Sequence, residues 1–237
     1  LTLINQENMI RTIAFCVLFF NASITFSQDI IINDGPYIFI EEEQLISKTI
    51  VNGSVVTTEL EPDAFDTFFD PKPSSFSNIE NIVALSDIHG QYDLVVEILQ
   101  NNGVIDANLD WNLGKGHLVI AGDIFDRGDK VTEVLWLIYK LEKQAEQVGG
   151  NLHFILGNHE YMVLHNDLRY LHEKYPEVSK LLNTSYDQLY GKNTVLGRWL
   201  RSKHTILKIN EHLFLHGGIS QDFISRAGVA FDSINAT

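Results

Sequence analysis

Four short clusters of polar residues carry side chains that bind metal ions or move protons. They are Ser86-Asp87-Ile88-His89-Gly90, Gly122-Asp123-Ile124-Phe125-Asp126-Arg127-Gly128, Gly157-Asn158-His159-Glu160 and His216-Gly217-Gly218. Each cluster follows a short apolar run, at a place where core packing alone does not require polar side chains. Mixed oxygen and imidazole ligands suit Mn, Fe or Zn better than calcium. The clusters therefore indicate a functional site, and any metal ion bound there would be held by His, Asp, Glu and Asn.

Strand and helix patterns alternate around these clusters and must position them. The chain reads as buried strands at 82–85, 118–121 and 152–156, helices at 91–102 and from 131 to about 148, a mostly helical stretch over 159–201, and a hairpin formed by 205–208 and 213–215. This alternation predicts an α/β layered domain. In such domains the ligand site lies at the carboxyl ends of the strands, where the clusters fall.

The clusters resemble the signatures of one known family. Asp-x-His-Gly, Gly-Asp-x-x-Asp-Arg-Gly, Gly-Asn-His-Glu and His-Gly-Gly stand in family order across residues 87–218, as in the calcineurin-like metallophosphoesterases of the phosphoprotein phosphatase superfamily. Asp167-Leu168-Arg169-Tyr170 and the exported type of amino terminus look most like the Shewanella-like protein phosphatase branch. The resemblance implies a metallophosphoesterase-type layered β-sandwich flanked by helices, here truncated at the carboxyl end.

The resemblance also implies a ligand set for two divalent ions, which together lower the pKa of water and hold the attacking and leaving oxygens of a phosphate ester. By match to the family motifs, Asp123 bridges the ions and Asp87 and His89 complete the first site. Asn158 and His216 are expected to hold the second ion.

Three further residues receive catalytic roles by the same match. Arg127 is expected to hold the phosphoryl oxygens with its planar fork, and His159 to protonate the leaving oxygen. Asp126 would orient the His159 ring and keep it charged. The structural alternative is an Asp126–Arg127 salt bridge, with His159 as a helix cap. Glu160 and Arg169 receive no role.

The second metal site departs from the family pattern. The family supplies another histidine well after His-Gly-Gly, whereas only Arg226 follows His216 in a helical pattern, and no histidine follows it. We therefore expect the chain to be a fragment of a longer phosphatase. The six histidines outside the motifs are expected to be structural; they are His117, His153, His165, His172, His204 and His212.

These features predict hydrolysis of phosphate monoesters, by a protein serine/threonine or tyrosine phosphatase. A dinucleoside polyphosphate hydrolase and a non-catalytic metal- or phosphate-binding protein are the alternatives. The expected partner is a phosphorylated protein or a small phosphate ester. Nucleic acid is excluded on charge, because 17 Lys and Arg against 31 Asp and Glu leave a net charge of −14.

The amino-terminal residues predict export. Arg11 precedes the apolar run 13–20, and Thr25-Phe26-Ser27 is a suitable site for signal peptidase. The run is shorter than the roughly 20 residues that cross a bilayer, so a stable membrane span is not expected. We therefore expect a periplasmic or secreted protein, with Leu1 to Asn8 upstream of a start at Met9. Cleavage before Gln28 would remove Cys16, the only cysteine.

The predicted organisation has four parts. They are a signal peptide with upstream residues (1–27), a β-rich segment (28–61), a linker (62–80) and an incomplete metallophosphoesterase domain (81–237). Within the β-rich segment, Asp34-Gly35 and Asn52-Gly53 are expected to form tight turns between antiparallel strands.

Overall fold

The computed structural model describes residues 31–227 and 231–235 of the chain. The predicted signal peptide lies outside these residues. Among the helices that are described, none has both the length and the apolar character needed to span a bilayer.

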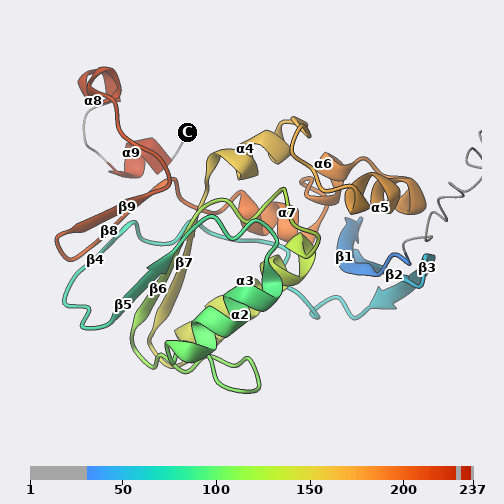
Figure 1. Ribbon diagram of the computed structural model, residues 1–237, viewed down its shortest axis with the longest axis horizontal. Coiled ribbons are helices and arrows are strands. Elements are labelled where there is room, and N and C mark those ends of the chain that lie inside the picture. The colour runs from blue at the N-terminus through green and yellow to red at the C-terminus, as the bar shows by residue number, and fades with distance from the viewer. Residues whose placement is uncertain (1–30, 228–230, 236–237) are drawn as a thin grey trace, which may run out of the picture. The chain divides into compact units, whose positions relative to one another are not determined.

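A three-stranded parallel sheet lies at the centre of the predicted α/β domain (Figure 1). Its strands are β5 (Ile82–Leu85), β6 (His117–Ala121) and β7 (Asn151–Ile155), in the order β5-β6-β7. Helices α2 (Tyr92–Asn101) and α3 (Val131–Gln147) form the crossovers, and α3 packs against β7. The predictions for these five elements are confirmed. Because the strands are parallel, all three polar clusters that follow them lie at one edge of the sheet.

A second sheet contains β4 (Ser75–Phe76), β8 (Ile206–Ile209) and β9 (His212–Leu215), in the order β4-β8-β9. The hairpin of β8 and β9 is confirmed. Strand β4 falls within 62–80, where we predicted only a linker. It has two residues and pairs in parallel with β8, a partner far along the chain, so no local periodicity reveals it.

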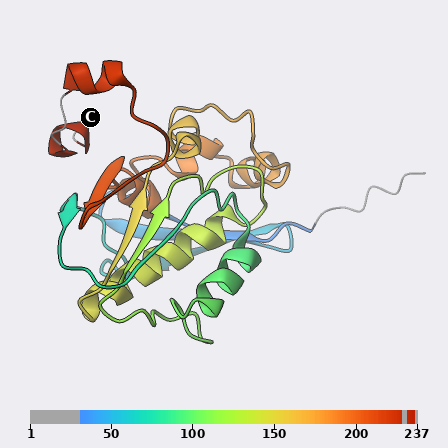
Figure 2. The same cartoon turned by 60° about the vertical axis from the view of Figure 1, so that its left-hand side comes forward.

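The two sheets face each other across a small apolar cluster, which gives the layered β-sandwich (Figure 2). Val119 of β6 and Ile155 of β7 pack there with Leu207 and Ile209 of β8. Leu118 belongs instead to the larger core on the helical side. This alternation of faces is the expected behaviour of successive residues in a strand.

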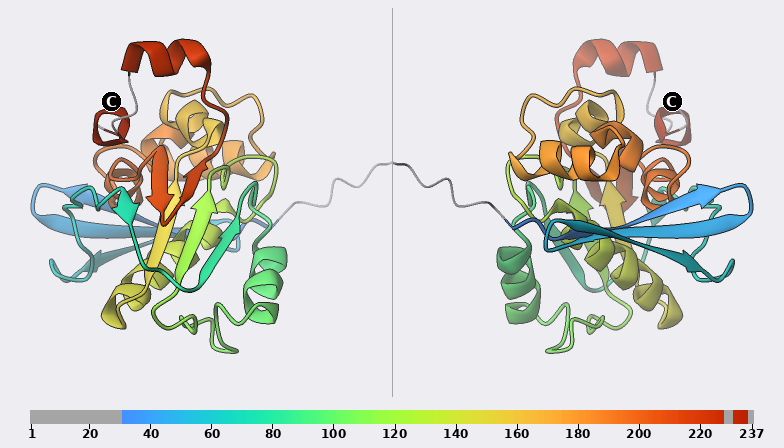
Figure 3. Two further views of the ribbon diagram at one scale, coloured as in Figure 1. Left: turned by 90° about the vertical axis from the view of Figure 1, so that its left-hand side faces the viewer. Right: turned by 90° about the vertical axis from the view of Figure 1, so that its right-hand side faces the viewer.

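The amino-terminal sheet is a meander of β1 (Asp34–Glu41), β2 (Gln44–Val51) and β3 (Ser54–Leu60) (Figure 3). The Asn52-Gly53 turn is confirmed, with φ of 50° and 74°. The turn predicted at Asp34-Gly35 is wrong, because both residues lie within β1, where the register with β2 shifts. Gly35, with φ of 108°, accommodates this irregularity. The chain turns instead at Glu42-Glu43.

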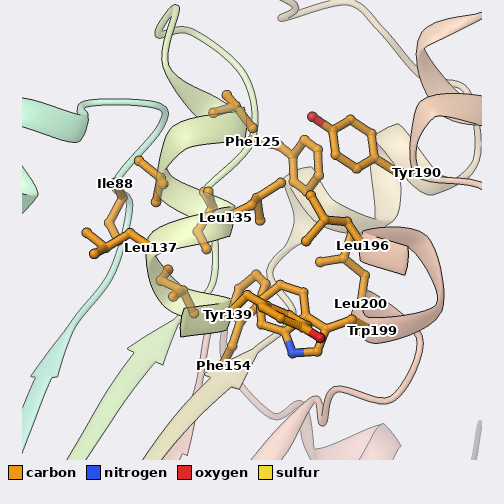
Figure 4. Packing of buried hydrophobic residues seen from close by; sticks show 14 of the residues in the cluster. Ile88, Phe125, Leu135, Leu137, Tyr139, Phe154, Tyr190, Leu196, Trp199 and Leu200 are labelled. Carbon is orange, nitrogen blue, oxygen red and sulfur yellow. The ribbon is translucent and has the colours of Figure 1, made fainter. Parts of the chain in front are cut away.

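Short helices fill most of 158–200, as expected; they are α4 (Asn158–Leu164), α5 (Lys174–Leu182), α6 (Tyr186–Leu189) and α7 (Val195–Leu200). Two more, α8 (Gln221–Ala227) and α9 (Phe231–Asn235), follow β9. Figure 4 shows the core between α3, β7 and α7, where Tyr139 and Phe154 pack beside Trp199. In the same core the buried Phe125 ring packs edge to face against the Tyr190 ring, with the ring centroids 4.7 Å apart. This packing anchors the loop that carries Asp123 and Asp126.

Candidate metal centre

The four predicted clusters meet at the carboxyl ends of β5, β6, β7 and β9. Backbone hydrogen bonds join the loops: the Asp87 N–H donates to the Gly122 carbonyl at 3.1 Å, and the His89 N–H to the Asp123 carbonyl at 2.9 Å. The backbone itself thus joins the first two clusters to one another.

Asp123 lies at the centre of this assembly and is only 3% exposed. Its Oδ2 atom is 3.1 Å from His216 Nε2, 3.8 Å from His89 Nε2 and 3.9 Å from His159 Nε2. Two groups of potential ligands share this residue: one combines it with His89 and His159, and the other with Asp87 and His216. A carboxylate common to two groups is what a bridging ligand requires.

The hydrogen bonds of His89 and His216 prepare both rings for a metal. His89 Nδ1 lies 2.7 Å from the Phe125 carbonyl oxygen, and His216 Nδ1 lies 2.7 Å from that of Ala121. A carbonyl only accepts, so each Nδ1 carries a hydrogen, and in the neutral form of each ring Nε2 has the lone pair that a metal ion needs. The Nε2 of His89 is buried and has no hydrogen-bond partner among the described residues. A buried acceptor left in this state fits a metal ligand.

Asp126 and His159 form the pair expected from the motifs. Asp126 Oδ2 accepts a hydrogen bond from His159 Nδ1 at 2.6 Å, and both residues are buried. Burial raises the pKa of the Asp126 carboxyl, and the hydrogen bond with His159 opposes that shift. The carboxylate therefore pairs with His159 rather than with Arg127, the alternative considered above. The backbone N–H of His159 donates to Asp123 Oδ1 at 3.1 Å, which connects the Asp126–His159 pair to the centre.

Arg127 and Asn158 lie at the rim of the site. Both are exposed, and neither side chain has a hydrogen bond or ion pair within the described part of the chain. The Arg127 N–H donates to the Tyr170 carbonyl at 3.0 Å. Asn158 is the first residue of α4. The structure thus places both residues beside the centre without engaging their side chains.

Glu160 is a site residue that the sequence analysis left without a role. Its buried carboxylate accepts hydrogen bonds from the N–H groups of Gly157, Asp123, Ile124 and Phe125, at 2.7, 2.8, 2.8 and 3.3 Å. Burial raises the pKa of Glu160, whereas the backbone donors lower it. The local signal was a glutamate three residues after the helix cap, the spacing of a capping box.

Gly122 and Gly157 let the loops approach one another closely. A Cβ atom on Gly157 would lie 2.2 Å from Asp123 Oδ1, and one on Gly122 would lie 2.7 Å from Gly157 Cα. Both distances are far below van der Waals contact, and Gly122 also has a φ of 86°. These glycines are therefore needed for the geometry around Asp123.

Strand ends that bring Asp and His side chains around a shared carboxylate are the arrangement expected of a metallophosphoesterase-type centre. Residues 80–236 match the family model described as calcineurin-like phosphoesterase, and the chain belongs to this family. The predicted family and fold class are confirmed.

Three similar proteins are informative, and the first two indicate the Shewanella-like branch. "Shewanella-like protein phosphatase 2" of Arabidopsis thaliana is 33% identical over 51% of this chain and 33% of its own. A crystal structure of a cold-active protein-tyrosine phosphatase of Shewanella sp. is 41% identical, with a TM-score of 0.82 over 86% of this chain and 66% of that one. A symmetrical bis(5'-nucleosyl)-tetraphosphatase of Chromobacterium violaceum is 28% identical over 62% of this chain and 46% of its own. The chain thus spans a third to a half of these curated relatives.

Proposed function

We propose that this chain carries the catalytic core of a metal-dependent phosphatase that hydrolyses phosphate monoesters on proteins. The observation that carries the proposal is the pair of histidines, His89 and His216, whose Nε2 atoms lie near the same Asp123 oxygen while each Nδ1 lies 2.7 Å from a backbone carbonyl oxygen. The similarity to a protein-tyrosine phosphatase structure supports a phosphorylated side chain as the substrate.

The ligand assignment stays the one implied by the motifs. Asp87, His89 and Asp123 would hold one divalent ion, and Asp123, Asn158 and His216 the other. Bound ions supply Lewis-acid activation of the nucleophile and of the phosphoryl group. The nitrogen and oxygen donors suit Mn, Fe or Zn.

Arg127 and His159 would act on the substrate directly, and Asp126 would act through His159. The Arg127 guanidinium, which has no partner among the described residues, lies at the rim and would bind two phosphoryl oxygens. His159, with its Nδ1 hydrogen held by Asp126, has Nε2 available to carry the proton that the leaving oxygen takes up. Asp126 stabilises the protonated ring, because the carboxylate is buried beside it.

A substrate panel tests the proposal. The purified chain is loaded in turn with Mn, Fe and Zn. It is assayed with three versions of one peptide, which carry phosphoserine, phosphothreonine or phosphotyrosine. We expect metal-dependent release of phosphate from at least one peptide and none with a chelator present. Metal binding without any turnover would overturn the proposed activity and leave a metal-binding protein.

A dinucleoside polyphosphate hydrolase is the second candidate, because the similar protein of Chromobacterium violaceum carries that activity in its name. The same panel therefore includes diadenosine tetraphosphate. Faster cleavage of the dinucleotide than of every phosphopeptide would select this candidate.

We further infer that the protein is exported, from Arg11, the apolar run 13–20 and Thr25-Phe26-Ser27. When the chain is expressed with its native amino terminus in a bacterial host, mature protein is expected in the periplasm or the medium, beginning near Gln28. Amino-terminal sequencing of the exported protein checks this. Exported protein that still begins at Leu1 or Met9 would contradict it.

A further inference from the structure

Tyr170 lies at the edge of the metal centre and has no role in the assignment above. Its side chain is 49% exposed, yet its ring packs against that of His159, with the centroids 5.4 Å apart. Its backbone carbonyl accepts the Arg127 N–H at 3.0 Å. Tyr170 is therefore joined both to the proposed acid and to the proposed phosphate-binding arginine.

Arg169 and Asp167 restrain the position of the Tyr170 ring. The Arg169 guanidinium lies 5.7 Å from the centre of the Tyr170 ring. Asp167 accepts two hydrogen bonds of 2.8 Å from that guanidinium, one on each carboxylate oxygen. A bidentate pair fixes the plane of the guanidinium, which in turn offers the ring a defined face to lie against. The structure thus presents an exposed aromatic ring in a restrained position, which lowers the entropy lost on binding.

The position of Tyr170 concerns the leaving group of the substrate. The leaving oxygen must come within hydrogen-bond reach of His159 if that residue is to protonate it. The group attached to this oxygen then lies beside the His159 ring, which is the ring that the exposed Tyr170 side chain packs against. An aromatic leaving group would gain an edge-to-face or offset-stacked contact there, and an alkyl group would not.

We propose that Tyr170 is a specificity-determining residue that packs against the aromatic ring of an aryl phosphate monoester, of which phosphotyrosine is the protein form. This inference rests on the proposed function and deepens it, because it names the class of leaving group. Arg169 and Asp167 are positioning residues that hold the Tyr170 ring.

The test compares aryl and alkyl substrates. The value of kcat/KM is measured for the metal-loaded chain with one peptide carrying phosphotyrosine or phosphoserine, in the wild type, Tyr170→Phe and Tyr170→Leu. We expect Tyr170→Leu to lower the ratio of phosphotyrosine to phosphoserine hydrolysis about 2-fold to 10-fold, the usual size of an aromatic pair contact. Tyr170→Phe keeps the ring and should keep the ratio. Tyr170→Met, which also lacks the ring, repeats the measurement if Tyr170→Leu does not fold.

Tyr161→Leu is the matched control. Tyr161 is a 41% exposed tyrosine of α4 whose hydroxyl lies 2.8 Å from that of Thr205. Its replacement by leucine should leave the ratio of phosphotyrosine to phosphoserine hydrolysis unchanged. An equal fall of both activities in Tyr170→Leu, with no change in ratio, would show that Tyr170 only positions His159 and would overturn the proposal.

A binding measurement separates this proposal from the proposed function. Phenylphosphonate and methylphosphonate are titrated into the metal-loaded wild type and Tyr170→Leu, since neither probe requires turnover. A phenyl preference that is lost in Tyr170→Leu supports the aromatic contact even if no peptide is hydrolysed, whereas a preference that persists refutes it. Absence of hydrolysis from every phosphopeptide counts against the proposed function alone.

Discussion

Replacing Asp123 by asparagine is expected to lower phosphatase turnover by about 1,000-fold or more and to weaken the binding of metal. Asp123 Oδ2 is the atom toward which His89 and His216 both point, at 3.8 and 3.1 Å. A carboxamide carries no charge and has only one acceptor oxygen, so it cannot bridge two cations in the same way. Metal content by mass spectrometry and kcat/KM with a phosphopeptide measure the two effects.

Asp93→Asn is the control for this variant. Asp93 is an exposed aspartate whose ion pair with Lys130 lies on the surface, and its loss should change neither metal content nor turnover. Full metal content with wild-type turnover in Asp123→Asn would remove Asp123 from the centre and with it the proposed ligand set.

His159→Asn is expected to lower turnover about 100-fold to 10,000-fold while metal content stays at the wild-type level, because general acid catalysis contributes about that much. The structure makes this a sharp experiment. His159 Nε2 is 3.9 Å from Asp123 Oδ2, so the ring also belongs to one of the two groups of potential ligands. If His159 is only an acid, its replacement lowers turnover and leaves the metal content unchanged. If His159 is a metal ligand, its replacement lowers the metal content as well.

The leaving group provides a second measure of the role of His159. A nitrophenolate leaves without being protonated, whereas a serine alkoxide requires a proton. His159→Asn should therefore cost more with phosphoserine than with p-nitrophenyl phosphate. His165→Asn, at the exposed end of α4, is the matched control and should leave both rates unchanged. Loss of metal in His159→Asn, to the extent seen in Asp123→Asn, would make His159 a ligand instead of an acid.

Local sequence patterns predicted most of the fold. The strands β5, β6 and β7 are short apolar runs followed by polar clusters, and hydrophobic periodicity marks α2 and α3, so each could be found within its own segment. Strand β4 could not, because its two residues are defined by pairing with β8. The turn misplaced at Asp34-Gly35 shows the same limit. A glycine with positive φ suits a turn or an irregular strand equally well, and the pairing with β2 decides between them.

The residues of the centre could be predicted, but their contacts could not. The motifs indicated Asp123, His89 and His216 by type and order. That two imidazoles donate from Nδ1 to backbone carbonyls follows only from the packing of the loops. The role of Tyr170 was not predicted for the same reason. Nothing in an isolated Asp-Leu-Arg-Tyr segment shows that the tyrosine ring will contact His159.

The carboxylate of Glu160 couples two parts of the centre that are far apart in sequence. It caps the start of α4, where His159 lies, and it also binds three consecutive N–H groups of the Asp123 loop. Any displacement of the first turn of α4 must therefore carry Asp123 with it or break several buried hydrogen bonds at once. These hydrogen bonds therefore oppose any change in the distance between His159 and Asp123. In a redesign of this centre, His159 and Asp123 form one structural unit and should be moved or replaced together.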